Sequence, residues 1–202
     1  MKTGSAAHDL DYLTHLAADS ARFVEALAQT PPEPRVPTCP GWDADDLLWH
    51  LGQVQWFWAA VIARGLTVHA EVENLDNGGR PAGRDGLLAF FGQASDDLRH
   101  NLAAASPQGS ALTWSQDQTV GFIRRRQAHE ALIHRIDAEL TAGDRTPMDP
   151  DLRTDGVEER CASWMPNQHP RLTSPRTRPL QCGSRPPIPA GPGCCGSASS
   201  PG

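Results

Sequence analysis

The sequence of 202 residues has no long apolar run and no excess of positive charge. No stretch approaches the roughly 18–20 apolar residues that a membrane-spanning helix needs, so we expect no membrane span. The formal net charge is −6 and no basic stripe is present, which makes a nucleic-acid-binding protein a poor interpretation. The N-terminus leads into an amphipathic stretch and not into an apolar signal core, so a cytoplasmic protein is expected.

Cysteine is scarce over most of the chain. Cys39 stands alone, and the other four cysteines lie in the last 42 residues: Cys161, Cys182, Cys194 and Cys195. This odd number and uneven placement argue against a disulfide framework, and neither a CxxC pair nor zinc-finger spacing is present. No feature next to Cys39 favours a reactive thiolate, so we interpret Cys39 as structural.

Apolar residues recur at helical spacing in four segments, which cover residues 8–29, 44–65, 84–105 and about 120–142. Asp43 is the predicted N-cap of the second segment, and Gly65 and Gly143 are the predicted ends of the second and fourth. No strand pattern and no internal repeat competes with these helices. Four amphipathic helices predict an all-α fold, in the form of a four-helix bundle.

Two segments that connect the predicted helices differ from them in composition. Residues 36–42 carry two prolines and a glycine and are expected to be irregular. Residues 66–82 are polar and are expected to form a loop, and long loops of this kind are often functional.

The last part of the chain, residues 159–202, differs in composition from the rest. It holds nine of the 18 prolines, and its five arginines and single acid give it a charge of +4, whereas the first 158 residues carry −10. Such a segment cannot bury enough apolar surface to fold alone. We therefore predict a bundle domain over residues 8–158, followed by a Pro/Ser/Gly/Arg-rich tail that is disordered or is a translated frameshift.

Three candidate metal ligands lie on two of the predicted helices. Glu130 and His134 stand four residues apart, which places both side chains on one helical face. His50 shares a face with apolar residues three and four positions away, which predicts that it points inward. Two imidazoles and one carboxylate suit Zn²⁺ and leave a coordination position for water or substrate. On the residues alone two alternatives stay open: His50 as a hydrogen-bonded core histidine, and the Glu130–His134 pair on a solvated face.

Several residues near these candidate ligands in the sequence also have possible roles. His129 lies about 100° round the helix from Glu130, so we interpret it as a neighbour of the site or a surface residue and not as a ligand. Asp137 could orient a ligand histidine or form an ion pair with an arginine. The run of arginines at 124–126 is typical of a solvated face; alternatively, Arg126 faces an anionic thiol or carboxylate substrate.

Three motifs, taken in order, resemble the mycothiol-dependent maleylpyruvate isomerase family. They are VPTCPGW at residues 36–42, DLLWHLG at 46–52, and HEALIHRIDA at 129–138, with Arg126 shortly before the last. The resemblance covers about residues 8–158. It implies the metal-binding N-terminal domain of that family, which has a DinB-like four-helix bundle.

The resemblance also implies a site and a chemistry. A divalent metal ion, usually zinc, would be held by His50, Glu130 and His134, and would activate the thiolate of a co-substrate, mycothiol. The implied reaction is cis–trans isomerisation of a small organic acid or electrophile by thiol addition, bond rotation and elimination, with Glu130 and Arg126 as candidate catalytic residues.

Two other functions remain open at this stage. One is a mycothiol S-transferase that uses the same site. The other is a non-catalytic metal-binding or regulatory bundle, or a truncated pseudoenzyme, because isomerase-type members carry a further C-terminal domain where this chain has the tail. No pattern in the sequence indicates an oligomeric state.

Overall fold

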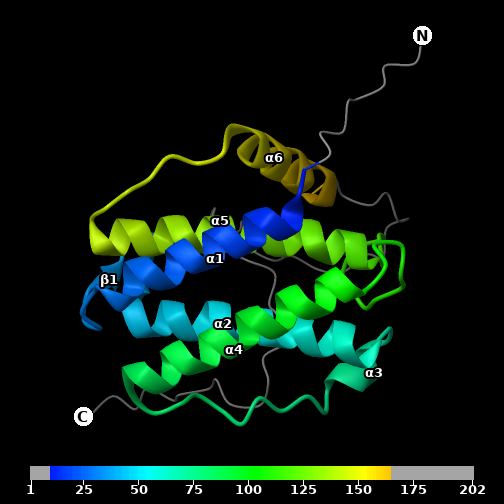
Figure 1. The fold of residues 1–202 in the computed structure, drawn as a ribbon, viewed down its shortest axis with the longest axis horizontal. Helices are drawn as coiled ribbons and strands as arrows, with labels where there is room; N and C mark the ends of the chain where they lie inside the picture. The colour runs from blue at the N-terminus through cyan, green and yellow to red at the C-terminus, as the bar shows by residue number, and fades with distance from the viewer. Residues whose placement is uncertain (1–9, 165–202) are drawn as a thin grey trace, which may run out of the picture. The chain divides into compact units, whose positions relative to one another are not determined.

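The computed structural model describes residues 10–164, and the side chains of residues 10–159. Its elements confirm the all-α prediction (Figure 1). The four long helices are α1 Tyr12–Ala28, α2 Ala44–Arg64, α4 Gly83–Ala104 and α5 Val120–Ala142. No described helix is long and apolar enough to cross a membrane. The predictions of disorder or a frameshift after residue 164 lie outside the described residues.

The helix ends follow the capping residues that the sequence supplies. The Asp43 side chain accepts a hydrogen bond from the backbone N–H of Asp46, and the Asp46 carboxylate accepts one from the N–H of Asp43. These reciprocal bonds satisfy donors at the start of α2. Gly65 and Gly143 end α2 and α5 in the left-handed conformation, with φ of 61° and 75°, which glycine adopts without steric cost. All three predicted helix boundaries are confirmed.

The helices pack as two neighbouring pairs. α1 lies along α5, α2 lies along α4, and α2 also contacts α5 (Figure 1). The core between them is closely packed: the rings of Phe23 on α1 and Phe91 on α4 lie 5.0 Å apart, and Leu47, Leu48 and Leu51 on α2 are fully buried. Burial of these apolar side chains is the main source of the bundle's stability, and it packs α1, α2 and α4 together.

The connector at residues 36–42 differs from the irregular segment that was predicted. Arg35–Val36 (β1) and Cys39–Asp43 (β2) pair as a short antiparallel hairpin, with Arg35 opposite Asp43 and Val36 opposite Cys39. Both strands are edge strands, where a proline that lacks an N–H is tolerated. The hairpin leads directly into α2. The predicted loop at 66–82 likewise contains one short helix, α3 His69–Val72.

A further helix follows α5. This helix, α6 Pro150–Trp164, lies beside α5 in Figure 1 and runs past residue 158, where the sequence placed the end of the bundle. Leu152 is fully buried in the apolar core, and Glu159 is only 3% exposed. The composition change at residue 159 therefore falls inside a helix that packs on the bundle.

Candidate metal site

His134 and Glu130 face each other across one turn of α5. His134 is 1% exposed, and its Nε2 atom lies 3.3 Å from Glu130 Oε2. The spacing of four residues brings the two side chains together as the sequence predicted. Because His134 is buried and Glu130 is half-buried, the solvated-face alternative for this pair is wrong.

Asp137 holds the other ring nitrogen of His134. His134 Nδ1 lies 2.9 Å from Asp137 Oδ2, and Asp137 Oδ1 accepts a hydrogen bond of 2.6 Å from the Thr38 hydroxyl. An ionised carboxylate can only accept, so Nδ1 carries the ring proton, and in a neutral ring the lone pair then lies on Nε2, towards Glu130. A carboxylate that orients a histidine in this way is a recurrent feature of metal sites.

His50 on α2 lies next to His134. Its ring lies edge-on to that of His134, with centroids 5.0 Å apart, and 4.7 Å from the ring of Trp42. The hairpin and the capped start of α2 position this face of the helix, since Trp42 belongs to β2 and Asp43 is the cap. The structure therefore brings all three predicted ligands into one neighbourhood.

The separation of Glu130 Oε2 and His134 Nε2 agrees with that of two donors of a zinc ion. Among the described residues, no group of three or more His, Cys, Asp or Glu side chains has the arrangement of a metal-binding cluster. Two donors bound 2.0–2.1 Å from a tetrahedral zinc ion stand about 3.3 Å apart, which is the separation of Glu130 Oε2 and His134 Nε2. The pair thus fits two positions of such an ion, and a third position requires the His50 ring to turn a nitrogen towards them.

The charges of Glu130 and His134 also favour a positive charge between them. In the neutral ring, the Nε2 lone pair of His134 faces a carboxylate oxygen, and both atoms are electron-rich. A positive charge between them relieves this repulsion, and either a second ring proton or a metal ion can supply it.

Arg126 is part of this neighbourhood and is not on a solvated face. It is 7% exposed, its Nη2 donates to Glu130 Oε1 at 2.8 Å, and its Nη1 donates to Glu159 Oε2 at 3.0 Å. The other two arginines of the run also have protein partners: Arg124 donates to backbone carbonyls and Arg125 to Asp155. The solvated-face interpretation is wrong for Arg126; its contact with an anionic substrate stays a prediction.

His129 belongs to a second polar cluster, on the side of α5 that faces α6. It is 3% exposed, and its Nε2 lies 2.8 Å from Asp155 Oδ2, which also accepts from the Tyr12 hydroxyl at 3.1 Å. Burial lowers the pKa of His129 and, together with Asp155, raises the pKa of Tyr12 to about 12. Burial opposes ionisation of Asp155 as well, but hydrogen bonds from Arg125 and His129 hold its pKa below the usual range. His129 is thus a buried neighbour and not a surface residue.

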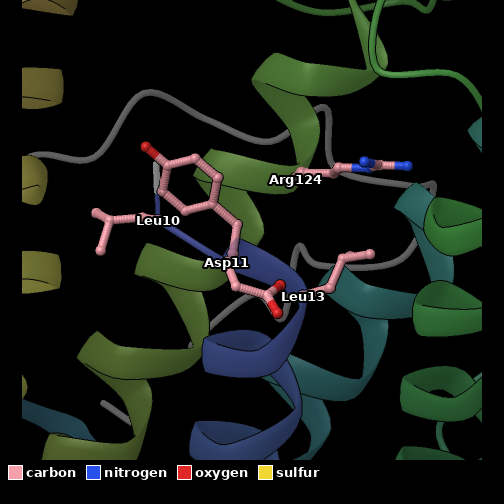
Figure 2. A pocket seen from close by; sticks show the side chains of 5 residues that line it. Leu10, Asp11, Leu13 and Arg124 are labelled. Carbon is pink, nitrogen blue, oxygen red and sulfur yellow. The ribbon is translucent and has the colours of Figure 1, made fainter. Parts of the chain in front are cut away.

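A separate hollow of about 300 Å³ lies at the start of α1 (Figure 2). Its walls are Leu10, Asp11, Tyr12, Leu13 and Arg124. None of the candidate ligands lines it, and the Arg124 guanidinium already donates to the carbonyls of Leu102 and Ala105. We therefore assign no role to this hollow.

Two residues that contact the predicted ones carry no local signal of a role. The sequence places Thr38 in the connector, within the VPTCPGW motif, and Glu159 in the tail. The partners of both lie far along the chain, since 99 residues separate Thr38 from Asp137 and 33 separate Arg126 from Glu159.

Comparison with known proteins agrees with the resemblance drawn from the three motifs. The chain matches the family model of the mycothiol maleylpyruvate isomerase N-terminal domain over residues 13–139, well over half of its length. A search of curated proteins and a search of solved structures gave no significant match. The matched region includes the hairpin and all three candidate ligands, whereas α6 lies beyond it. The chain belongs to the mycothiol maleylpyruvate isomerase N-terminal domain family.

Proposed function

We propose that this protein is a metal-dependent, mycothiol-linked enzyme of the maleylpyruvate isomerase type, with a divalent ion held by His50, Glu130 and His134. One observation carries the proposal: Glu130 Oε2 and His134 Nε2 stand 3.3 Å apart while Asp137 keeps the proton on the opposite ring nitrogen. Two imidazoles and a carboxylate favour zinc, and leave a position for a thiol or water.

The residues of the chain have distinct parts in this proposal. A bound ion would supply positive charge that lowers the pKa of a coordinated thiol or water. Asp137 keeps His134 in the tautomer that presents Nε2, and Thr38 in turn holds Asp137. Trp42 packs against His50 and limits the orientations of its ring.

The proposed reaction leaves the composition of the substrate unchanged. The sulfur of the thiolate forms a bond to one carbon of the cis double bond, whose π electrons move onto the conjugated carbonyl. The former double bond is then single and rotates, and the carbonyl electrons return to expel the thiolate. The substrate is a small unsaturated organic acid. A mycothiol S-transferase would use the same thiolate but displace a leaving group from an electrophile.

Metal analysis of the purified protein tests the site. We expect about one zinc per chain in the wild type and less than about a tenth of that in His50→Ala and His134→Ala, because each change removes one of three ligands. His100→Ala is the control, since His100 is an exposed histidine on α4. Unchanged metal content in both ligand variants would contradict the proposal.

Thiol dependence tests the activity. We expect isomerisation by the zinc-loaded protein to saturate with mycothiol and to be lost in Glu130→Gln. Formation of a stable thiol adduct with release of a leaving group would indicate the S-transferase. Metal binding with no thiol-dependent product would indicate a non-catalytic metal-binding module and would contradict the proposed enzyme.

A further inference from the structure

Helix α6 reaches the candidate metal site through one side chain. Glu159 is 3% exposed, and its Oε2 accepts a hydrogen bond of 3.0 Å from Arg126 Nη1. Arg126 in turn donates to Glu130 through its other terminal nitrogen. Glu159 lies 20 residues beyond the end of the family match at residue 139, so the family assignment says nothing about it.

Arg126 donates a hydrogen bond to one oxygen of the Glu130 carboxylate. Its Nη2 lies 2.8 Å from Oε1, while Oε2 is the oxygen that lies near His134 Nε2. This arrangement orients the Glu130 carboxylate so that a single oxygen is directed to the proposed ion. It thereby favours monodentate coordination, which suits a four-coordinate zinc ion.

The orientation of the Glu130 carboxylate depends on Glu159, because the positive charge of Arg126 beside a metal ligand would oppose binding of the ion. A lone Arg126 would repel a divalent cation a few ångströms away, and the low dielectric of the interior strengthens that repulsion. Glu159 neutralises this charge. It also fixes the guanidinium plane, since each terminal nitrogen then has its own carboxylate.

The charges of the side chains in contact around the site match a divalent ion. These side chains are Asp137, His134, Glu130, Arg126 and Glu159. With a neutral histidine they comprise three carboxylates and one guanidinium, and so carry a formal net charge of −2. Without Glu159 the net charge would be −1, and a bound divalent ion would leave an uncompensated positive charge in the interior.

We propose that Glu159 is a positioning residue of the metal site, which acts through Arg126 to orient Glu130 and to balance the charge of the ion. This inference rests on the proposed function, because it requires an ion at the three ligands. It makes α6 part of the site, although α6 lies outside the matched family domain.

The test compares two neighbouring glutamates of α6. Glu159→Gln removes the buried charge, and Glu158→Gln removes one charge from an exposed position. The readout is the Kd of the full-length protein for Zn²⁺ alone, measured by competition with a chromogenic chelator. We expect Glu159→Gln to weaken zinc binding about 10–100-fold, as loss of partners behind metal ligands does. Glu158→Gln should change the Kd less than about twofold, since an exposed charge is screened by solvent.

A structural role alone would give a different pattern. If Glu159 merely stabilises the fold, Glu159→Gln lowers the urea midpoint of the metal-free protein and leaves the Kd for Zn²⁺ unchanged. That outcome would overturn the inference. The visible spectrum of the Co²⁺-loaded protein is a second readout: we expect Glu159→Gln to alter it, because the Glu130 carboxylate is no longer held to one oxygen.

A double-mutant cycle covers the case in which Glu159→Gln folds poorly. The pair Arg126→Met and Glu159→Met replaces a buried ion pair by apolar side chains, a change that is often neutral for stability. If Glu159 acts through Arg126, Glu159→Met alone weakens zinc binding, and adding Arg126→Met recovers part of the lost affinity, because the double variant again carries a net charge of −2 at the site. A double variant that binds zinc as weakly as Glu159→Met, or more weakly, would contradict the inference.

The wild type separates failure of this inference from failure of the proposed function. If wild-type protein binds no zinc, the metal site itself is refuted, and the inference with it. If wild type binds zinc through His50 and His134 but Glu159→Gln binds it equally well, only the role of Glu159 is refuted.

Discussion

Two buried histidines lie five residues apart on α5, and each contacts an aspartate. His134 contacts Asp137 through Nδ1, so its Nε2 faces Glu130 and the neighbouring His50 ring. His129 contacts Asp155 through Nε2, so its Nδ1 faces inward, where it has no hydrogen-bond partner among the described residues.

The two clusters, which we name the His134 cluster and the His129 cluster, differ in their surroundings. Next to His129, the backbone of Gly156 on α6 is so close that an added Cβ atom would lie 3.2 Å from Nδ1. Arg125 also neutralises Asp155, with an ion pair of 2.9 Å. In the His129 cluster, Arg125 balances the charge of Asp155 and Gly156 occupies the space beside the ring, whereas in the His134 cluster a second ring proton or, as we propose, a metal ion supplies the positive charge between Glu130 and His134. The same residue types thus make a helix contact in one place and a candidate site in the other.

The largest effect that separates the clusters is expected from His129→Ala. This change leaves Asp155 and a cavity in the interior and should lower the free energy of unfolding by about 2–3 kcal/mol. Urea unfolding measures the loss. Zinc content should stay at the wild-type level, because His129 is not a ligand; loss of zinc from a variant that remains folded would break the comparison.

The next effect is expected from Asp137→Asn. An amide is a weaker acceptor for His134 Nδ1–H and no longer contributes negative charge, so we expect zinc affinity to fall about 10–100-fold. Chelator competition measures it. Asp144→Asn is a suitable control, since it removes an exposed carboxylate just beyond α5. Equal affinities for these two variants would show that Asp137 does not support a metal ligand.

A smaller effect on the free energy of unfolding is expected from Gly156→Ala. Packing against His129 determines whether this change stabilises or destabilises the protein. Alanine favours a helix by about 0.5–1 kcal/mol over glycine, but here its Cβ would press on the His129 ring and cost about 1–3 kcal/mol. We expect a net loss of about 1 kcal/mol in urea unfolding. Gly92→Ala on α4, where an added Cβ meets nothing within 4 Å, should stabilise the protein; stabilisation by both changes would show that His129 is not tightly packed.

The smallest effect is expected from acid titration of Asp155, one of 24 acidic residues in the chain. Its pKa in the folded state lies below the usual value of 3.8, so the unfolded state binds more protons between the two values. Its contribution to stability is therefore complete above pH 3.8 and is lost as the pH falls through the folded pKa. Urea midpoints measured from pH 5 downwards should fall less steeply in Asp155→Asn than in the wild type. An identical slope would contradict the pKa shift.

Much of the fold could be predicted because its signals are local. The apolar spacing, the Asp43 cap, and the glycines at 65 and 143 place α2 and α5 within a residue or two of their observed ends. The hairpin could not be found in this way, since a strand of five residues with a proline has no alternating pattern. The extent of α6 was missed because the composition at residue 159 suggests a tail, while the burial of Glu159 depends on Arg126, 33 residues earlier.

In the site, too, the local contacts could be predicted from the sequence and the long-range contacts could not. Glu130 and His134 are one turn apart, so their meeting follows from helical geometry alone. His50 was a candidate because it shares a face with apolar residues of its helix, but only the motifs of a family made its grouping with the other two specific. The interactions of Asp137 with Thr38 and of Asp155 with Tyr12 join residues 99 and 143 positions apart, and no local pattern contains such information. Helical spacing alone separates His134, the candidate ligand, from His129, but the partners that bury His129 beside α6 could not be found in the sequence.

The most direct test of the central claim is the zinc content of His134→Ala and His129→Ala, measured side by side on folded, full-length protein by elemental analysis. We expect about one zinc per chain in the wild type and in His129→Ala, and less than about a tenth of that in His134→Ala. Equal zinc content in the two variants would contradict the division of α5 into a candidate metal site and a closed helix contact.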